Sequence, residues 1–548
     1  MQTIKNLISK IPKEVSYVTD TLENAGFEAY LVGGCVRDIL MDRKPKDWDI
    51  TTNAKPDQII GLFNKTVYEN EFGTVIVCVP YETNTLDVSR LSAKASASAD
   101  ETLRQIEVTP YRVETKYSDF RHPDEVKFSE KLEDDLKRRD FTVNAMAFRV
   151  KGHTNDSNKN TNGQMVDLYE GQKDIKDRIL KSVGNPDDRF KEDALRMLRA
   201  VRISLQLGFS VSYESSESIL KNADLIKKIS KERIRDEFLK IISSEHPSVG
   251  MVMLQKFGLL KHIIPELEEG IDCRQGGEHI YDVWNHLLNA LQHSADKNWP
   301  VEVRLAALFH DIGKPRSRRL AEPMNNLAWS GQDRDPGDRG PDKLLSRGAK
   351  SAKKEFTFYG HEVISAKMAK NILERLKFSK KEIELVEKLV RNHMFFSDTE
   401  QITLSAVRRI IKKVGPENIW LLMNVRECDR VGMRKKEAPY RLRKYFAMIE
   451  EALHDPVSVS QLKIDGNFMI KKLGITPGPR MGSILHALLE EVLDDPAKNT
   501  EEHLSDLAKS LNMLPDDALQ TLGDRGKEKK EKLEEEEVGK LHAKHGVK

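Results

Sequence analysis

The chain is poor in cysteine and has no long apolar run. Its four cysteines, Cys35, Cys78, Cys273 and Cys428, lie far apart and form no C-x-x-C pair, which argues against a disulfide framework and against a thiolate zinc site. No segment approaches 18 consecutive apolar residues, and the N-terminal segment carries no continuous apolar stretch, so we expect neither a membrane span nor a secretion signal. The cytoplasm is therefore the expected location.

The chain also has almost no net charge. Lys and Arg number 89 and Asp and Glu 87, a net charge of +2. This balance excludes a protein that is basic over its whole surface, but it allows a local basic face that could meet nucleic acid. With 39% hydrophobic residues in 548, the chain is long enough for roughly three to four domains with cores of their own.

Strand and helix patterns alternate in the first 150 to 180 residues. Alternating or continuous apolar runs predict strands at 29–32, 47–51, 74–79, 106–113 and 141–150. A helical segment precedes the first of them, and another follows the turn at Gly33 and Gly34. The polar, turn-rich residues 151–163 predict a surface loop. This pattern indicates an α/β head.

The rest of the chain is mainly helical. Apolar residues three and four apart predict a helical neck over 187–267 and a helical body over 275–455. Segment 321–354 is rich in Gly, Pro, Asp, Arg and Lys without a period, and we expect a long loop or a disordered insert. Beyond Leu514, blocks of like charge favour a solvated helix or a disordered tail over a packed element.

Two carboxylates in the head suggest metal chemistry. Asp47 and Asp49 stand at i and i+2 of the strand expected at 47–51, so both should point to one face and could share divalent metals. Metals held there would suit phosphoryl transfer from a triphosphate. Upstream, the amides of Gly33 and Gly34 suit phosphate oxygens, and Arg37 could add a charged fork. The alternative is a pair of solvated strand carboxylates.

Four sequence blocks support the phosphoryl-transfer interpretation. They are LVGGCVRDIL (31–40), KDWDI (46–50), RRDFTVNAMA (138–147) and RFKEDALRMLRAVR (189–202). Their order and spacing resemble the class II tRNA nucleotidyltransferase and bacterial poly(A) polymerase family. The resemblance implies an α+β fold, with a polymerase-beta-like nucleotidyltransferase head followed by a mostly α-helical neck, body and tail. It also implies Asp47 and Asp49 as catalytic Mg²⁺ ligands, with Gly33, Gly34 and Arg37 at the nucleotide.

Further residues of the head are candidates by the same resemblance. Glu107 sits where relatives often carry a third catalytic glutamate, although a structural role at a strand edge is the alternative and the segment 82–104 before it is an insert of unknown role. Arg139 and Asn144 can hydrogen-bond phosphate and ribose, and Asp140 could accept from a ribose hydroxyl or orient Arg139.

The block at 192–202 predicts how a base is chosen. Asp193 and Arg196 are three residues apart on an expected helix and hence side by side. A carboxylate accepts from an exocyclic amino group and a guanidinium donates to ring acceptors, so the pair would serve cytosine and adenine but not guanine or uracil. Arg199 could continue the row toward the triphosphate, and the resemblance adds Arg202. A solvated helix face is the alternative.

Segment 117–128 resembles the flexible loop that in relatives helps switch from C to A addition, with Asp119 and Arg121 as its polar residues. Its presence argues for a capacity to add A. Full CCA addition, A-only addition and poly(A) addition all remain open.

A second group of ligand-type residues lies in the helical body. It resembles the HD-domain metal phosphohydrolases, which implies His286, His310, Asp311 and Asp429 as primary ligands and His361 and His393 at a second metal or phosphate. Nitrogen and oxygen donors suit Mg²⁺, Mn²⁺, Ni²⁺ or Fe, and a metal there would suit phosphate ester hydrolysis. The alternative is a scaffold that supports tRNA.

These patterns together predict four parts. They are a nucleotidyltransferase head (1–180), a neck that binds nucleobase and tRNA (181–270), an HD domain with the insert 321–354 (271–455) and a C-terminal helical segment with a charged tail (456–548). The expected function is template-independent addition of CCA to tRNA 3′ ends from CTP and ATP with Mg²⁺, releasing pyrophosphate, with tRNA held at its 3′ end and acceptor/TΨC region. A-only or poly(A) addition, and an HD phosphohydrolase with a nucleotide-sensing head, are the alternatives. Monomer or dimer is left open.

Overall fold

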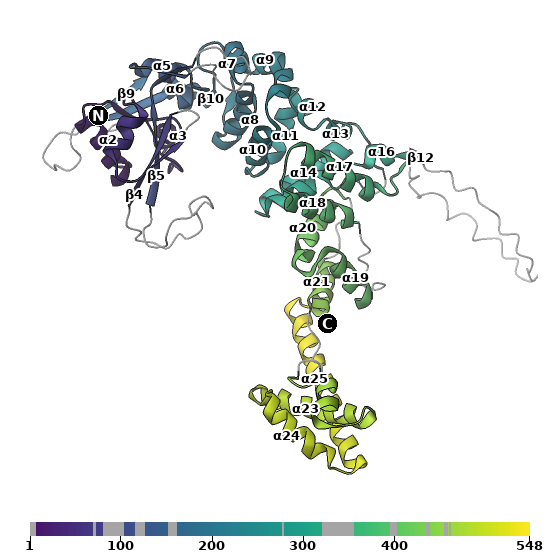
Figure 1. Ribbon diagram of the computed structural model, residues 1–548. Helices are drawn as coiled ribbons and strands as arrows, with labels where there is room; N and C mark the ends of the chain where they lie inside the picture. Colours follow the sequence, from purple (N-terminus) through teal and green to yellow (C-terminus); the bar gives the residue numbers. More distant parts are fainter. Residues whose placement is uncertain are drawn as a thin grey trace, which may run out of the picture. The chain divides into compact units, whose positions relative to one another are not determined.

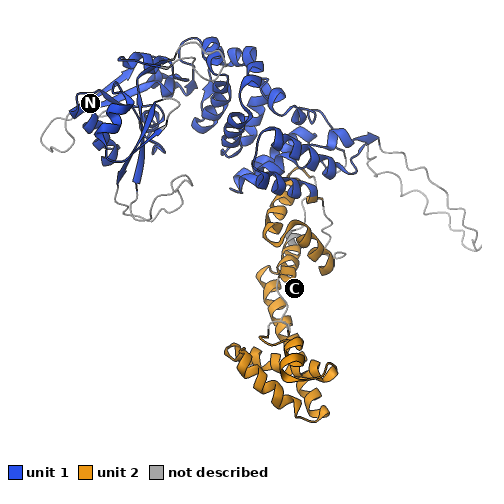
Figure 2. Ribbon diagram, in the orientation of Figure 1, with its two compact units in different colours: residues 1–391 blue, residues 392–548 orange. Residues whose placement is uncertain are grey.

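The computed structural model describes residues 7–69, 73–80, 103–114, 126–151, 162–276, 279–320, 356–394, 403–433, 439–453, 459 and 462–547. The chain divides into two compact units, residues 1–391 and 392–548 (Figure 2). Asp119, Arg121 and the insert 321–354 lie outside the described residues. Within the described ranges, no helix has the length and apolar character needed to cross a membrane.

A seven-stranded mixed sheet forms the head of the first unit (Figure 1). In the order β3-β4-β5-β2-β1-β8-β9, its strands are Thr66–Glu69, Thr74–Pro80, Leu103–Pro110, Asp49–Thr52, Ala29–Val32, Met146–Lys151 and Asn162–Asp167. Only the central pair β2 and β5 is parallel; all other neighbours in this sheet are antiparallel. Two short strands, β6 (Arg112–Glu114) and β7 (Val126–Phe128), pair beside it.

Two expected strands begin later than the apolar pattern suggests. The strand expected at 47–51 starts at Asp49, so Asp47 lies in the bend before β2. The strand expected at 141–150 starts at Met146, because residues 142–144 form the 3₁₀ turn η2 (Thr142–Asn144). The buried side chains of η2 continue the apolar run without continuing the strand.

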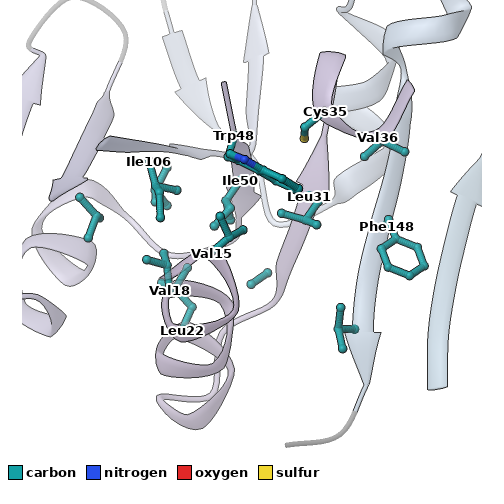
Figure 3. Close-up of a cluster of buried hydrophobic side chains, with 14 of the residues drawn as sticks. Val15, Val18, Leu22, Leu31, Cys35, Val36, Trp48, Ile50, Ile106 and Phe148 are labelled. Atoms are coloured by element: carbon teal, nitrogen blue, oxygen red, sulfur yellow. The ribbon is translucent and has the colours of Figure 1, made fainter. Parts of the chain in front are cut away.

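The core of the head lies between this sheet and helix α2 (Lys13–Asn24). Val15, Val18 and Leu22, three and four residues apart, are all fully buried. Figure 3 shows them facing the apolar side chains of the sheet, among them Leu31 and Ile106. The 3.6-residue period of α2 therefore meets the two-residue period of the strands at this face. The remaining head helices are α3 (Gly34–Leu40), α4 (Pro56–Leu62), α5 (Leu132–Lys137) and α6 (Gly171–Asp177).

A run of helices follows the head in the first unit. The neck comprises α7 (Pro186–Glu192), α8 (Leu195–Leu207), α9 (Tyr213–Asn222), α10 (Lys231–Ile242), α11 (Pro247–Lys256), α12 (Leu260–Ile263) and α13 (Pro265–Glu268). A parallel two-strand pair, β10 (Ile179–Leu180) and β11 (Ser210–Val211), joins head and neck. Then come α14 (Val283–Asp296), α15 (Val301–Phe309), α16 (Lys314–Ser317), the pair β12 (Arg319–Leu320) and β13 (Phe356–Thr357), α17 (His361–Arg375) and α18 (Lys380–Asn392). The expected α+β head with helical neck and body is confirmed.

The second unit is helical throughout its described part. Its helices are α19 (Leu404–Val414), α20 (Ile419–Asp429), α21 (Pro439–Leu453), α22 (Gly466–Leu473), α23 (Pro479–Asp494), α24 (Glu501–Asn512) and α25 (Asp516–Lys544). The expectation of a solvated or disordered tail is wrong for the start of α25, which packs on α23. A Cβ on Gly523 would lie 2.8 Å from the Cα of Ser483, and one on Gly526 would overlap the carbonyl of His486. These two glycines let the helices approach closely, which block charge alone could not reveal.

Candidate functional site

Three carboxylates predicted as catalytic lie at one end of the parallel strand pair of the head. Asp49 is the first residue of β2, and in the register of β2 and β5 it stands directly opposite Glu107. Residues opposite each other in a sheet point to the same face, so both carboxylates share one side. Asp47 lies two residues before Asp49, outside the strand and exposed. The structure thus brings Asp49 and Glu107 together, with Asp47 on the bend that enters the same strand.

The turn after β1 closes on the same place. Gly33 has a left-handed φ of 81°, and a Cβ there would lie 3.4 Å from Oδ2 of Asp49 and 3.2 Å from Nη1 of Arg139. Burial raises the pKa of Asp49, the charge of Asp47 adds to the rise, and Arg139 opposes it. A bound cation would favour the ionised form of such a group. Gly33 is therefore required both by its backbone and by the close approach of these side chains.

A buried aspartate that our sequence reasoning missed holds Arg139 in this position. Both oxygens of Asp135 are occupied: Oδ2 accepts from Arg139 at 2.9 Å and Oδ1 accepts from Arg138 at 2.5 Å. Although burial alone would raise the pKa of Asp135, the two guanidinium groups lower it. The i,i+4 spacing of Asp135 and Arg139 on a helix was the signal that could have found the pair.

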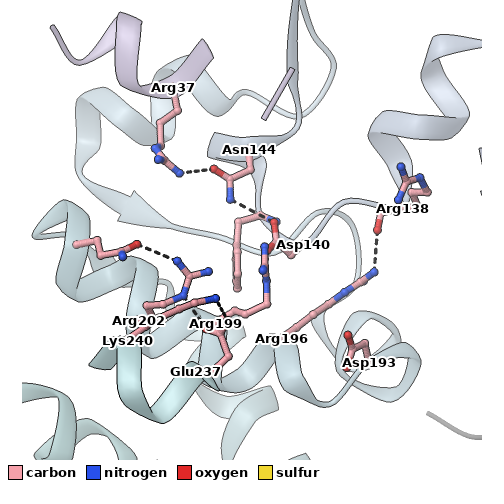
Figure 4. A network of polar contacts seen from close by, with 12 residues as sticks. Arg37, Arg138, Asp140, Asn144, Asp193, Arg196, Arg199, Arg202, Glu237 and Lys240 are labelled. Atoms are coloured by element: carbon pink, nitrogen blue, oxygen red, sulfur yellow. Dashed lines mark hydrogen bonds and ion pairs between the residues drawn. The ribbon is translucent and has the colours of Figure 1, made fainter. Parts of the chain in front are cut away.

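A chain of hydrogen bonds connects polar side chains of the head with α8 of the neck (Figure 4). Arg37 on α3 donates to Oδ1 of Asn144 at 2.6 Å, and the amide of Asn144 donates to Oδ1 of Asp140 at 3.3 Å. The other oxygen of Asp140 accepts two bonds from Arg199 on α8, at 2.8 and 2.5 Å. Despite burial, this pairing lowers the pKa of Asp140 to about 2. Four of the predicted nucleotide-binding residues thus form one connected network.

Asp193 and Arg196 are not adjacent on one helix, contrary to our expectation. Asp193 follows α7 with extended backbone, and its Oδ1 accepts from the backbone N–H of Leu195, the first residue of α8. Its Oδ2 accepts from Arg233 on α10 at 2.7 Å. Arg196 instead donates to Glu192 at 2.9 Å and to the carbonyl of Arg138 at 2.8 Å. The extended backbone of Asp193, whose short side chain bonds a nearby backbone N–H, interrupts the helical run between α7 and α8.

Arg202, drawn in the same view (Figure 4), pairs with a different carboxylate, Glu237. Its Nε donates to Glu237 on α10 at 2.6 Å, and Glu237 also pairs with Lys240 at 3.0 Å. Glu237 is buried, and although burial raises its pKa, Arg202 and Lys240 bring it below its ordinary value. Glu237 is a second acidic partner that our sequence reasoning missed, because no local spacing links it to Arg202.

The second candidate site lies among the helices that follow the neck. His286 on α14 and His310 at the end of α15 place their Nε2 atoms 3.0 Å apart. Nδ1 of His310 lies 2.8 Å from the carbonyl of Ala307. A carbonyl only accepts, so Nδ1 donates this hydrogen bond, and in the neutral imidazole the lone pair then lies on Nε2. Asp311 Oδ2 lies 3.3 Å from both Nε2 atoms. These three buried side chains bring potential metal-ligand atoms close together.

Two more buried groups complete this cluster within the first unit. Nε2 of His361, at the start of α17, lies 3.1 Å from Oδ1 of Asp311, and its Nδ1 donates to the carbonyl of Phe358. Lys314 lies 2.5 Å from Oδ2 of Asp311 and 2.6 Å from Oε1 of Gln275. Although burial raises the pKa of Asp311, Lys314 and the imidazoles hold it well below its ordinary value. Lys314 and Gln275 were not among the predicted ligands.

The other two predicted ligands belong to the second unit. Asp429 is the last residue of α20, and His393 comes directly after α18. The role of Asp429 and His393 as metal ligands stays a prediction.

The donor sets of the two sites differ in kind. The head offers only carboxylate oxygens, which suit a hard cation such as Mg²⁺. The cluster around Asp311 offers imidazole nitrogens with one carboxylate, which suits transition metals as well. Each set therefore fits a divalent metal of its own class.

Four family models match the chain. They are "Poly A polymerase head domain" over residues 29–181, "Probable RNA and SrmB- binding site of polymerase A" over 208–271, "HD domain" over 276–431 and "tRNA nucleotidyltransferase domain 2" over 357–508.

Curated relatives and one solved structure are similar to the chain. The CCA-adding enzyme of Lactobacillus helveticus is 43% identical over 230 residues, 42% of this chain and 49% of that protein. The chain thus spans about half the length of that relative. The match to the CCA-adding enzyme of Ligilactobacillus salivarius, 29% identical, covers 92% of this chain and 98% of that protein. A crystal structure of the Bacillus stearothermophilus CCA-adding enzyme in complex with CTP has a TM-score of 0.52 at 22% identity, covering 91% of this chain and 97% of that chain. This last likeness shows the fold.

Proposed function

Because this chain belongs to the family of class II tRNA nucleotidyltransferases and bacterial poly(A) polymerases, with an HD domain, we propose that it adds CCA to tRNA 3′ ends. Its substrates would be CTP, ATP and the 3′ hydroxyl of tRNA, and pyrophosphate would leave. The observation that carries the proposal is the register of β2 and β5, which sets Asp49 beside Glu107 against the turn at Gly33.

Asp47, Asp49 and Glu107 would hold Mg²⁺, which when bound supplies charge neutralisation at the triphosphate and activates the attacking hydroxyl. The residues of the chain do the positioning. Gly33 lets the backbone approach the phosphates, and Arg139, fixed by Asp135, presents a guanidinium beside Asp49. Positive charge aimed at the triphosphate stabilises the charge that develops on the leaving pyrophosphate.

Arg37 is the second cationic group of this arrangement. Its guanidinium already bonds Asn144 and Asp38, so it is held in one orientation before a nucleotide arrives. Planar guanidinium forks bind phosphate oxygens in pairs, which gives direction as well as attraction. Arg199 and Asp140 would extend the nucleotide site toward the ribose and base.

Base choice would rest on Asp193 and Arg196 at the start of α8. Each carboxylate oxygen of Asp193 accepts one bond within the chain, and a carboxylate oxygen has room for a second donor. An exocyclic amino group of cytosine or adenine would supply it, whereas uracil and guanine present a carbonyl there. Arg202, which is paired with Glu237, would act at the end of this row.

We test the proposal with purified protein, labelled CTP or ATP, and three RNAs. These are tRNA lacking CCA, tRNA ending in CC, and an unstructured RNA. CCA addition predicts C and A incorporation into the first, A into the second and none into the third. A incorporation into CC-ended tRNA alone would indicate an A-adding enzyme, and labelling of the unstructured RNA a poly(A) polymerase.

Two variants control this assay. Asp47→Ala should abolish incorporation, while Asp57→Ala, which changes an exposed carboxylate on α4 away from the site, should leave it unchanged. Incorporation in none of the three RNAs, or equal incorporation in Asp47→Ala, would contradict the proposed transfer.

A second activity is favoured by the cluster of His286, His310, Asp311 and His361. We propose that this site holds a divalent metal, Mg²⁺, Mn²⁺, Ni²⁺ or Fe, and hydrolyses a phosphate ester. Its primary ligands would be His286, His310, Asp311 and Asp429, with His361 and His393 at a second metal or at the phosphate. Lys314, a buried cation against Asp311, would attract the phosphate group. Release of phosphate from RNA with a 3′-phosphate or 2′,3′-cyclic phosphate should disappear in Asp311→Ala; persistent release would refute the ligand assignment.

We also retain the division of the chain into residues 1–180, 181–270, 271–455 and 456–548 as a proposal about its domains. The cytoplasm is the proposed location, because tRNA is the proposed substrate.

A further inference from the structure

The short turn η2 carries Asn144, yet it has little to hold it in place by itself. It is one 3₁₀ turn of three residues, closed by the bonds Asn144 N–H to Phe141 O (2.9 Å) and Ala145 N–H to Thr142 O (3.0 Å). Isolated 3₁₀ turns are weak because their hydrogen bonds are poorly aligned. The position of Asn144 must therefore be set by what packs against η2.

Helix α6 packs against η2. The hydroxyl of Thr142 donates to Oδ2 of Asp174 at 2.6 Å, and both side chains are buried, with 2% and 8% of their surface exposed. A Cβ on Gly171 would overlap the carbonyl of Thr142. Helix and turn are thus in direct backbone contact, with one charge-assisted hydrogen bond across the contact.

Helix α6 is itself anchored to the sheet. Asp167, the last residue of β9, accepts from the backbone N–H of Gly171 at 2.7 Å and of Gln172 at 3.0 Å. Glu170 and Arg178, which flank the helix, both have left-handed backbone, with φ of 61° and 55°. Such residues persist only where the surroundings determine the conformation. Helix α6 therefore transmits a fixed position from the sheet to η2.

Both hydrogen bonds of the Asn144 side-chain amide depend on the position of η2. Its oxygen accepts from Arg37 and its nitrogen donates to Asp140, so a small shift of η2 would strain or break both bonds. Misplacement by about 1 Å at a positioning contact can cost 10²-fold in rate.

We propose that Asp174 and Thr142 form a positioning pair that sets Asn144, and through it Arg37 and Asp140, for nucleotide binding. Neither residue belongs to the predicted site. The inference rests on the proposed nucleotidyl transfer, and it adds α6 as the element that aligns the nucleotide residues of the head with those of the neck.

The test is a double-mutant cycle. Thr142→Val keeps the shape of the side chain but removes the donor, and should raise KM for CTP and for ATP about tenfold. Thr142→Ser restores the hydroxyl and should bring KM back to within about twofold of the wild type. In the Asn144→Ala background, Thr142→Val should add little, because its effect passes through Asn144. Asp174→Ala removes the acceptor of the same hydrogen bond and should likewise raise KM, whereas Asp177→Ala, an exposed change on the same helix, should leave KM unchanged.

A merely structural role gives a different pattern. Loss of folded protein lowers kcat with KM unchanged, and the effects of Thr142→Val and Asn144→Ala then multiply; either result would overturn the positioning role. If Thr142→Val fails to fold, Asp174→Asn replaces it in the cycle. CTP binding, measured by calorimetry, separates the proposed nucleotidyl transfer from the positioning role of Thr142 and Asp174. A wild type that binds CTP without incorporating it contradicts the transfer. The double-mutant cycle, repeated with the Kd for CTP in place of KM, then still decides the role of the pair. A wild type that does neither contradicts both.

Discussion

Asp49 stands opposite Glu107 across the parallel strand pair β2 and β5 of the head sheet. The two carboxylates share a face at the end of β2, and Asp47 precedes it by two residues. We expect Glu107→Gln to lower kcat/KM for CTP incorporation about 10²-fold or more, because it removes one of three anionic oxygen ligands from a site that depends on metal charge. Steady-state incorporation into tRNA lacking CCA measures the effect.

Gln105 supplies the matched control for this variant. It is exposed and lies two residues before Glu107 on the same strand, and hence on the same face. Gln105→Ala should leave kcat/KM within about twofold, since Gln105 pairs with Cys78 and not with Asp49 in the sheet register. Equal rates for Glu107→Gln and the wild type would assign Glu107 a purely structural role.

Gly33→Ala should remove activity beyond its effect on stability. Gly33 and Gly26 both have positive φ, 81° and 88°, and Gly33 also has a ψ of −137°, outside the left-handed helical region. Alanine should therefore cost about 1–2 kcal/mol in free energy of unfolding at Gly26 and about 1–3 kcal/mol at Gly33. Only at Gly33 would the new Cβ also crowd a side chain, with Nη1 of Arg139 at 3.2 Å; at Gly26 nothing lies within 4 Å.

Urea unfolding and incorporation kinetics of the two variants separate these effects. We expect both variants to be destabilised, Gly33→Ala at least as much as Gly26→Ala, with kcat/KM lowered about 10²-fold in Gly33→Ala alone. A comparable loss of activity in Gly26→Ala would mean that backbone strain, and not the crowding of Arg139, is responsible.

Acid should weaken the contact between head and neck through Asp140. Its pKa in the folded protein is about 2, against an ordinary value of 3.8. A depressed carboxyl pKa stabilises the folded state above the unfolded value and loses that contribution as pH falls through the folded value. The contribution, about 2 kcal/mol, should be complete at pH 5 and fade between about pH 4 and pH 2.

Asp140→Asn tests this dependence. At neutral pH its free energy of unfolding should lie below that of the wild type, and the two should converge as pH approaches 2. Asp57→Asn, which changes an exposed carboxylate, should show no such convergence. A difference between wild type and Asp140→Asn that is independent of pH over this range would exclude ionisation as its cause.

The cluster around Asp311 should bind metal independently of the head. His310→Ala removes one of two Nε2 atoms that lie 3.0 Å apart, and should abolish tightly bound transition metal as measured by elemental analysis. His293→Ala, on the same helix as His286, is the control and should keep it.

Chelation should separate the proposed CCA addition from the proposed phosphate ester hydrolysis. After treatment with a chelator, added Mg²⁺ alone should restore CCA incorporation, because the head ligands are all oxygens. Phosphate release should return more fully with Mn²⁺, Ni²⁺ or Fe than with Mg²⁺, because imidazole nitrogens favour transition metals. Full loss of incorporation in His310→Ala would contradict this independence.

Local sequence determined the parts of this protein whose chemistry depends on short spacings. The alternation of apolar residues predicted the strands around Asp49, and four ordered blocks predicted most of the residues that the structure gathers at Arg37, Asp140 and Arg199. Histidines and an aspartate of the second cluster were also visible as residue types. The strands follow from the two-residue period that the backbone sets, whereas the four blocks and the second cluster were assigned by their resemblance to known families.

Only the tertiary structure decided the partners of those residues. Asp135 fixes Arg139, Glu237 occupies Arg202, and Asp174 supports η2. It also placed Asp193 before α8 instead of within it, and packed the charged helix α25 onto α23 through two glycines. Asp135 and Arg139 are close in sequence, but the pair Arg202 and Glu237 and the pair Thr142 and Asp174 each join segments far apart in the chain. Which acid meets which base then depends on how sheets and helices pack, and no local period records that.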